Sequence, residues 1–277
     1  MRPALKYNGG KWLDGPWIIS HFPEHRIYGE LFGGGGSVLL QKPRAKIEYY
    51  NDLDSQVYTF FKVLRTRPKD LIRSIRYTPY SREFFEHEVC EPADDELEVA
   101  LRFAARCWMG RTNNRLSRTS FRRAGNLYVP GGYIPPKLWA DLRGYIEAAR
   151  RLRGVVIENC DWHDLALQLD GPETLLYIDP PYWRGVRKAG RMYDVDMMST
   201  LQHARMLRKI RSLRSMIIIS GYDSALYRRL LPGYTVVTKT STDDARNTRT
   251  EALFISPNAV KQQDLFSANN LFEERAS

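Results

Sequence analysis

Short apolar runs, each closed by a turn signal, are the main pattern of hydrophobic positions along this chain. The clearest is Thr174–Tyr182, TLLYIDPPY, where the apolar run ends in Asp179 and two prolines. A run of this length before a turn is typical of a buried strand in a parallel sheet. The prolines end the strand because neither can donate a hydrogen bond to a neighbouring strand. Similar runs predict strands at Arg26–Leu31, Lys46–Tyr50, Gly154–Asn159, Ser215–Ser220, Tyr234–Thr238 and Glu251–Ser256.

Helical periodicity fills most of the intervals between these runs. It predicts helices at Trp17–Phe22, Gln56–Arg65, Leu97–Met109, Lys137–Leu152, Ser199–Arg211 and Ser224–Leu231. Polar loops are predicted between Gln56–Arg65 and Leu97–Met109. Alternating strands and helices favour the α/β class. The strand pattern stops between residues 56 and 153, and a hundred residues or so is too long for a plain loop. We therefore expect a sheet domain over residues 1–55 and 154–277 and an inserted recognition domain over 56–153.

Charge and cysteine content narrow the class of protein. The 277 residues carry a net charge of +10, which favours a polyanionic partner, although simple solubility explains such a charge nearly as well. The three cysteines have no metal-binding spacing, so we expect no metal site and a reducing, cytoplasmic setting. No apolar run reaches membrane-spanning length, and residues 1–11 lack a signal-peptide core, so no membrane association is expected.

Two glycine-containing segments indicate a ligand site. The strand predicted at Arg26–Leu31 is followed by Phe32, four glycines (Gly33–Gly36) and an apolar segment, and a strand, glycine loop and helix can present backbone N–H groups to a ligand. The next predicted strand ends in Asn51-Asp52, where an acidic side chain can accept hydrogen bonds from ribose hydroxyls. These features predict a nucleoside-containing cofactor. The order Gly-x-Gly-x-x-Gly is absent, which disfavours a nicotinamide cofactor.

The corner after Thr174–Asp179 offers a second kind of chemistry. Asp179 and the proline carbonyls are hydrogen-bond acceptors, and Tyr182 adds a flat aromatic face, so the set suits a planar ring that carries an amino group. The alternative is an ordinary turn with a capping Asp and a buried Tyr. His203, on a predicted helix, is interpreted as structural.

The most basic stretch lies inside the insertion. Arginines alternate there with amide and hydroxyl side chains: Arg111, Asn113, Asn114, Arg115, Ser117, Arg118, Thr119, Ser120, Arg122 and Arg123. Such side chains on loops are typical of contacts to phosphates and base edges, although a solvated surface would have a similar composition. A hairpin-like segment, Gly125–Tyr133, follows.

Taken together, these segments resemble the Dam-like (D12 class) DNA adenine-N6 methyltransferases, especially their phage and prophage members. The matching segments are KYNGGK at Lys6–Lys11, ELFGGGGSV at Glu30–Val38, Asn51-Asp52, Asn159–Asp161, DPPY at Asp179–Tyr182, ISGYDSALY at Ile219–Tyr227 and RTEALFI at Arg249–Ile255. They cover nearly the whole chain in the order of the family. The resemblance implies the Rossmann-like, seven-stranded mixed sheet of the SAM-dependent methyltransferases, with Glu251–Ser256 as its antiparallel last strand.

The resemblance also implies roles for individual residues. Catalysis would involve Asp179, Pro180, Pro181 and Tyr182, and the methyl donor, S-adenosyl-L-methionine, would contact Tyr7, Lys11, Phe32, Gly34, Gly36, Asp52, Asp161, Trp162 and Asp179. Asp179 and the Pro180 carbonyl would accept the amino protons of a flipped-out adenine, on which Tyr182 stacks. Contacts to double-stranded DNA would come from Arg111, Asn113, Arg115, Arg118, Arg122, Arg123 and Lys137. The expected state in solution is a monomer, with dimerisation on DNA left open.

One departure from the family pattern concerns specificity. Ala124-Gly125 and Leu127-Tyr128 differ from the residues usual at the hairpin, so recognition of GATC is not expected by default. Three alternatives stay open: methylation of cytosine N4 or of RNA, a DNA-binding protein without catalysis, and, more distantly, a nicotinamide oxidoreductase. Asp rather than Ser before the two prolines disfavours cytosine.

Overall fold

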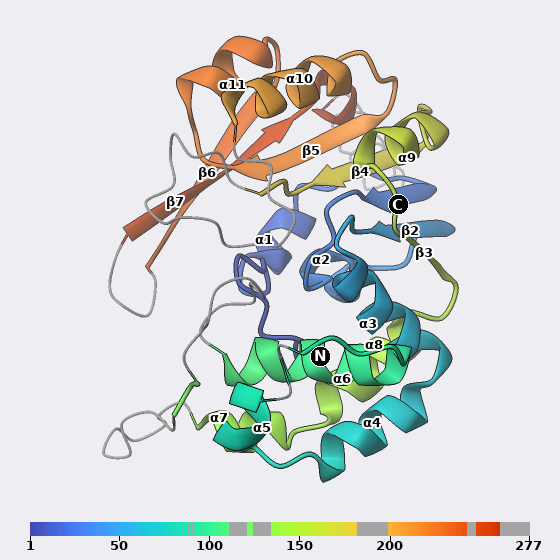
Figure 1. The fold of residues 1–277 in the computed structure, drawn as a ribbon. Coiled ribbons are helices and arrows are strands. Elements are labelled where there is room, and N and C mark those ends of the chain that lie inside the picture. Colours follow the sequence, from blue (N-terminus) through green and yellow to red (C-terminus); the bar gives the residue numbers. More distant parts are fainter. Residues whose placement is uncertain are drawn as a thin grey trace, which may run out of the picture.

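The fold is built on one seven-stranded sheet with helices on both faces (Figure 1). The computed structural model describes residues 1–87, 89, 91–110, 121–123, 134–181, 199–242 and 248–260. The strands are β1 (Ile27–Glu30), β2 (Ile47–Asn51), β3 (Val155–Glu158), β4 (Thr174–Ile178), β5 (Met216–Gly221), β6 (Thr235–Thr242) and β7 (Thr248–Ile255). Each of the seven strands predicted from the sequence is present, and β6 and β7 are longer than predicted.

The strand order is β3-β2-β1-β4-β5-β7-β6. Strands β1 to β5 pair in parallel, whereas β7 is antiparallel to both of its neighbours. Strand β6 therefore points in the same direction as the central strands, and β7 alone is reversed. The seven-stranded mixed sheet expected from the resemblance is confirmed, including the antiparallel direction of the last strand.

The order reverses at β1, which lies between β2 and β4. Glu30, the last residue of β1, is paired with Tyr50 of β2 and with Tyr177 of β4, so the three strands end together along one edge. Open α/β sheets bind ligands beyond the carboxyl ends of their strands at such a reversal point. This edge holds the glycine loop, Asp52 and Asp179.

Strands β4 and β5 in the middle of the sheet are buried at every position, which explains why they are continuous apolar runs. Leu175 and Tyr177 of β4 belong to one core, together with residues of α1, α2 and α3, while Leu176 and Ile178 belong to a second core with residues of α9, α10 and α11. The helices are α1 (Gly15–Ile19), α2 (Ser37–Gln41), α3 (Ser55–Thr66), α4 (Pro68–Tyr77), α5 (Arg82–His87), α6 (Glu96–Met109), α7 (Pro135–Trp139), α8 (Arg143–Arg151), α9 (Trp162–Gln168), α10 (Thr200–Ile210) and α11 (Ala225–Leu230).

Several helix predictions need correction. The single helix predicted at Lys137–Leu152 is two helices, α7 and α8, because Asp141 interrupts it: its carboxylate accepts hydrogen bonds from the backbone and the guanidinium of Arg143. Helices α4 and α5 lie where polar loops were predicted, and α9 was not predicted. The first helix is Gly15–Ile19 rather than Trp17–Phe22.

The helices of the insertion share a core with the sheet. Side chains of α3, α4, α6 and α8 pack in the same cluster as Tyr28 and Tyr50 of the sheet. In Figure 1 these helices form a layer below the sheet, on the side opposite α10 and α11. Residues 56–153 as a separate recognition domain stay a prediction.

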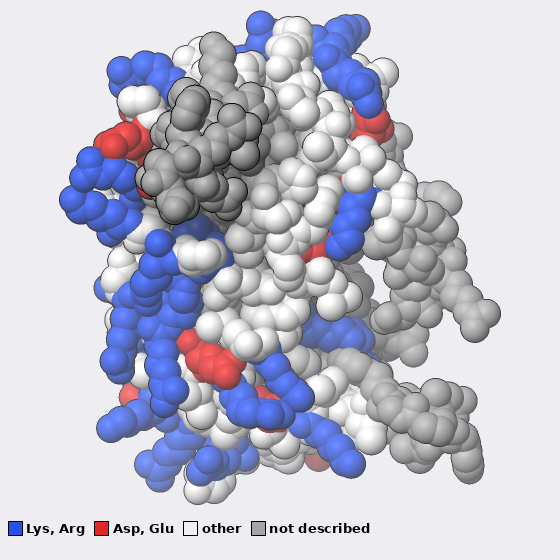
Figure 2. Space-filling view, turned by 180° about the vertical axis from the view of Figure 1, so that it is seen from behind, with Lys and Arg blue, Asp and Glu red and all other residues white. Residues whose placement is uncertain are grey.

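Basic side chains are widespread on the surface. Figure 2 shows that Lys and Arg predominate over Asp and Glu on the back of the molecule, mainly toward one side and the bottom of the view. The net charge of +10 is thus not confined to the arginine-rich stretch of the insertion. Within the part of the chain that the structure describes, no helix has the length and apolar character needed to cross a bilayer.

Candidate active site

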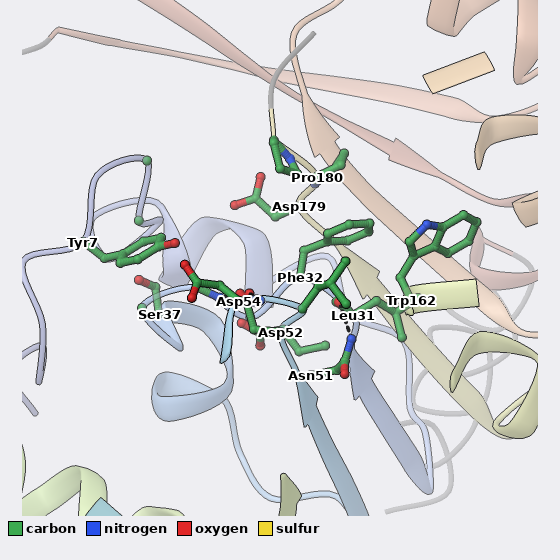
Figure 3. Close-up of a pocket in the computed structure, with 18 of the residues that line it drawn as sticks. Tyr7, Leu31, Phe32, Ser37, Asn51, Asp52, Asp54, Trp162, Asp179 and Pro180 are labelled. Atoms are coloured by element: carbon green, nitrogen blue, oxygen red, sulfur yellow. Dashed lines mark hydrogen bonds between the residues drawn. The ribbon is translucent and has the colours of Figure 1, made fainter. Parts of the chain in front are cut away.

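Asp179 lies directly after β4, at the edge where the central strands end, and borders a cavity (Figure 3). Its Oδ1 accepts a hydrogen bond from the Ser220 hydroxyl on β5, at 2.7 Å, and lies 3.8 Å from the Lys11 ammonium. Among the described residues, none donates a hydrogen bond to Oδ2. One carboxylate oxygen is therefore held by the protein, while the other can accept a hydrogen bond from a ligand.

The Ser220 hydroxyl is itself held by a buried tyrosine. Because Ser220 uses its only hydroxyl hydrogen on Asp179, the Tyr177 hydroxyl, 2.9 Å away, must donate to Ser220. Tyr177 is 1% exposed, so its ring position is fixed by packing. The chain Tyr177–Ser220–Asp179 thus fixes the orientation of the carboxylate from within the sheet.

Lys11 connects Asp179 to a second carboxylate. Its ammonium lies 3.0 Å from Glu251 Oε2 on β7, and the side chain is 5% exposed. Burial alone would lower the pKa of Lys11, but Asp179 and Glu251 raise it overall, so the ammonium is retained. Burial raises the pKa of Asp179 to about 6, against the opposing effects of Lys11 and the Ser220 hydrogen bond.

The glycine loop approaches the site because no side chain stands in the way. The Gly33 N–H donates to the carbonyl of Asn51, and a Cβ at Gly33 would come within 2.1 Å of the Tyr50 ring. Gly34 and Gly36 have φ of 50° and 65°, in the left-handed region that glycine tolerates best. The Tyr7 ring lies over the loop, since a Cβ at Gly34 would be 2.8 Å from it.

Asp52, after β2, holds this loop against the sheet edge. Its Oδ2 accepts from the Gly34 N–H at 2.7 Å and its Oδ1 accepts from the Asp54 N–H at 2.9 Å. Burial raises the pKa of Asp52 to about 7, although both backbone hydrogen bonds lower it. Each carboxylate oxygen retains a lone pair for a ligand hydroxyl.

Aromatic rings form the opposite wall. The rings of Phe32 and Trp162 are stacked, with centroids 6.2 Å apart and an interplanar angle of 28°. Asp161 also lines the cavity, but one of its oxygens already accepts from the His163 N–H and caps α9. The cavity therefore combines a flat apolar wall with acidic groups at its rim.

Two comparisons with known proteins agree on the family. A family model described as D12 class N6 adenine-specific DNA methyltransferase matches residues 7–243. The chain belongs to this family. Proteins named DNA adenine methylase from two strains of Vibrio cholerae serotype O1, Classical Ogawa 395 and El Tor Inaba N16961, are each 26% identical to it over 250 residues, covering 84% of this chain and 85% of theirs. The chain is therefore a DNA adenine methyltransferase and uses a methyl donor.

The methyltransferase cavity is strongly acidic. Its described lining includes the carboxylates of Glu30, Asp52, Asp54, Asp161 and Asp179, and Lys11 is the only Lys or Arg among the described residues that line it. Glu30 is 2% exposed, and burial raises its pKa to about 8 despite hydrogen bonds from the Tyr28 hydroxyl and the Leu39 N–H. Glu30 is therefore mostly protonated near neutral pH, and the negative charge of the cavity, which favours a positively charged ligand, comes mainly from the other carboxylates.

Most of the predicted site residues line one cavity. The exceptions among the donor contacts and catalytic residues are Gly36, which neighbours the lining residues of the loop, and Tyr182, which is outside the described residues. The site also includes four residues that the sequence did not indicate individually: Glu30, Asp54, Ser220 and Glu251. Three of them stand in the motifs that carry the resemblance, namely ELFGGGGSV, ISGYDSALY and RTEALFI. Nothing local shows that Ser220 reaches Asp179 or that Glu251 pairs with Lys11 beside it.

The predicted DNA contacts are only partly visible. Arg111, Asn113, Arg115 and Arg118 lie outside the described residues, while Arg123 and Lys137 are exposed. Arg122 is half-buried, and its guanidinium donates to the Gly110 carbonyl through Nε and Nη2, at 3.2 and 2.9 Å. Its backbone is bonded too, to Met109 and to the Tyr80 hydroxyl. Arg122 therefore ties this segment to the end of α6.

Proposed function

We propose that this methyltransferase uses S-adenosyl-L-methionine as its donor and methylates N6 of an adenine that has been turned out of duplex DNA. The observation that supports this most directly is the position of Asp179. One oxygen of Asp179 accepts a hydrogen bond from Ser220, while the other accepts none from the described residues. Asp179 borders the same cavity as the glycine loop. An acceptor for the target amine and the proposed donor site are thereby adjacent.

The chemistry of the cavity fits the proposed donor. When bound, S-adenosyl-L-methionine supplies an electrophilic methyl group on a positively charged sulfonium, and it also carries an ammonium group. The acidic lining would stabilise these charges. Asp52 would accept hydrogen bonds from ribose hydroxyls, and Trp162 and Phe32 would flank the adenine ring, with Asp161 at its edge.

The remaining donor contacts would come from the loops. The backbone of Gly34 and Gly36 would lie along the methionine part, because their positive φ gives the loop a course that other residues rarely adopt. Tyr7 covers the same loop, and Lys11 would contribute by holding Asp179 in its ionised form.

Asp179 and the carbonyl of Pro180 would act on the target amine. The adenine N6 lone pair is delocalised into the ring, so the amine is a poor nucleophile. Two acceptors for its protons favour a pyramidal nitrogen whose lone pair is free to attack, and the carboxylate opposes the positive charge that develops there. Fixed orientation supplies much of the remaining rate. This role requires Asp179 to be deprotonated.

The target base must leave the helix for this contact to form. Turning a base out costs about a few kcal/mol, which stacking on Tyr182 and phosphate contacts would offset. We assign the phosphate and base contacts to Arg111, Asn113, Arg115, Arg118, Arg122, Arg123 and Lys137. Pro181 would shape the corner, and residues 56–153 would form the recognition domain. The enzyme would be a monomer in solution, with dimerisation on DNA left open.

The experiment is methyl transfer from tritiated S-adenosyl-L-methionine to duplex DNA by the purified enzyme, followed by nucleoside analysis. We expect N6-methyladenine from the wild type and none from Asp179→Ala. Asp223→Ala, which removes a surface carboxylate paired with Arg228, serves as the control and should retain transfer. N4-methylcytosine as the product, or DNA binding without transfer, would refute the proposal.

A further inference from the structure

His203 of α10 is a fully buried side chain that touches the corner after Asp179. It is 0% exposed, and its Nε2 lies 3.1 Å from the carbonyl oxygen of Pro181. Its other ring nitrogen, Nδ1, lies 2.9 Å from the hydroxyl of Tyr227 on α11. The imidazole therefore connects the backbone of the Asp-Pro-Pro corner to a helix on the outer side of the sheet.

The two contacts define the state of the ring. A carbonyl oxygen can only accept, so the hydrogen must be on Nε2, which donates to Pro181. In the neutral ring Nδ1 then has no hydrogen and accepts from the Tyr227 hydroxyl. This tautomer satisfies both contacts, whereas the neutral tautomer with its hydrogen on Nδ1 loses the contact with Pro181.

Tyr227 is a firm support for this ring. It is 5% exposed, and its ring packs against Phe254 of β7 with centroids 5.2 Å apart. Its backbone N–H is bonded to Ser224, the residue that caps α11. The hydrogen bond that holds Nδ1 of His203 thus originates from the core rather than from a surface side chain.

The contact with Pro181 bears on the neighbouring carbonyl, that of Pro180. A proline ring fixes its own φ, so the main remaining freedom between these two peptide planes is the ψ of Pro181. Holding the Pro181 oxygen removes this freedom. On the other side, Asp179 is held by β4 and by Ser220. The direction of the Pro180 carbonyl is therefore determined from both ends of the corner.

We propose that His203 is a positioning residue for methyl transfer. By holding the Pro181 carbonyl, its side chain directs the Pro180 carbonyl toward the target amine. This inference rests on the proposed role of Pro180 as the second acceptor. His203 does not touch the reacting atoms; its contribution is the geometry of the backbone acceptor. A misdirected acceptor lowers the rate of the chemical step and leaves donor binding unchanged, because the donor contacts other than Asp179 lie on other loops and Asp179 is held by Ser220.

Two conservative substitutions separate this role from simple core packing. The amide nitrogen of Gln can occupy the place of Nε2 and still donate to Pro181, whereas the shorter amide of Asn replaces Nδ1 and reaches only Tyr227. Both replace a buried imidazole by an amide, so a purely structural His203 would make the two variants behave alike. A positioning role predicts that His203→Gln retains transfer and that His203→Asn loses it.

The measurement is the single-turnover rate of methyl transfer at saturating donor and DNA, beside the Kd for S-adenosyl-L-homocysteine and the thermal midpoint. We expect His203→Asn to lower the rate about 100-fold and His203→Gln less than about 5-fold, with Kd within about 3-fold of wild type in both. Equal rates in the two variants, with an active wild type, would overturn the inference. An inactive wild type would instead refute the proposed function.

Removing the hydroxyl of Tyr227 provides a second test that keeps the imidazole. In Tyr227→Phe, Nδ1 loses its hydrogen-bond partner and the ring is held by polar contact only through Nε2, so we expect the single-turnover rate to fall about 10-fold. Tyr234→Phe is the matched control, since Tyr234 packs against the same core and should retain the wild-type rate. If the two variants had equal rates, the inference would fail even where His203→Asn does not fold.

Discussion

Ser220 on β5 donates its hydroxyl hydrogen to Oδ1 of Asp179, beyond the end of β4, over 2.7 Å. The two strands are parallel neighbours, so this bond fixes the carboxylate relative to the sheet itself. The other oxygen of Asp179 is then presented to the cavity in a defined direction. Several expectations about activity and stability depend on this arrangement.

Removing the Ser220 hydroxyl should lower turnover without weakening donor binding. In Ser220→Ala the carboxylate can rotate, so we expect kcat to fall about 10- to 100-fold at an unchanged Kd for the donor. Ser215→Ala is the matched control: the Ser215 hydroxyl makes the same kind of bond, to Asp170 at 2.8 Å, just before β5 begins. Steady-state kinetics of both variants test this, and equal losses of kcat would contradict it.

Replacing Asp179 by Asn should abolish transfer and stabilise the fold. The pKa of Asp179 is raised to about 6, so the folded state binds its proton more tightly than the unfolded state does. Stability linked to this group is therefore present at low pH and lost as pH rises from about 4 to about 6. At pH 7.5 the Asn side chain is uncharged, so the variant does not lose the stability that the wild type loses when Asp179 ionises.

We expect Asp179→Asn to gain about 1–3 kcal/mol at pH 7.5, a rise of several degrees in thermal midpoint. At pH 4, where the wild-type carboxyl is protonated, the two proteins should have nearly equal midpoints. Thermal scans at the two pH values measure this difference. A lower midpoint for the variant at pH 7.5 would show that ionised Asp179 stabilises the fold.

The acid limb of the pH–rate profile should respond in opposite directions to changes at Lys11 and Glu251. Transfer requires ionised Asp179, so kcat/KM should fall as pH decreases through about 6. Lys11 lowers the pKa of Asp179 and Glu251 raises it. Lys11→Met should therefore move the acid limb to higher pH, and Glu251→Gln should move it to lower pH. Shifts in the same direction would exclude this electrostatic coupling.

A methyl group at Gly33 should disrupt donor binding. Its Cβ would lie 2.1 Å from the Tyr50 ring, so the loop or the ring must move. Because Tyr50 also donates to the Gly34 carbonyl, we expect Gly33→Ala to weaken donor binding at least about 10-fold, by about 1.4 kcal/mol. Gly171→Ala, where the nearest atom would be at 3.8 Å, is the control for titration calorimetry. Wild-type affinity in Gly33→Ala would mean that this loop does not form the donor site.

The two neighbouring arginines of the insertion should differ in their effect on DNA binding. Exposed Arg123 is available for a phosphate, so Arg123→Ala should reduce the slope of log K against log salt by about 1 and leave the thermal midpoint unchanged. Arg122→Ala should also lower the thermal midpoint, since its guanidinium holds the Gly110 carbonyl. Binding isotherms at several salt concentrations and thermal scans measure both effects. An unchanged slope for Arg123→Ala would place it away from DNA.

The sequence by itself determined the strands and the two corners of the site. Strands buried on both faces must be largely apolar, so β4 and β5 are visible as short apolar runs, and the two prolines mark the end of β4. The glycine loop was also predictable, because close packing at Gly33 and positive φ at Gly34 and Gly36 leave few other residues. These features depend on local backbone conformation and on burial. Both restrict which residue types a position can hold, so they can be recognised in the sequence.

Only the tertiary structure decided which side chains meet. Ser220 and Asp179 are 41 residues apart, and Lys11 and Glu251 are 240 residues apart. These pairs exist because β5 lies beside β4 and because β7 is placed between β5 and β6. His203 was interpreted as structural from the sequence, which could not show its contact with Pro181. Strand order has no local signature, so the groups that orient Asp179 could be found only in the folded chain.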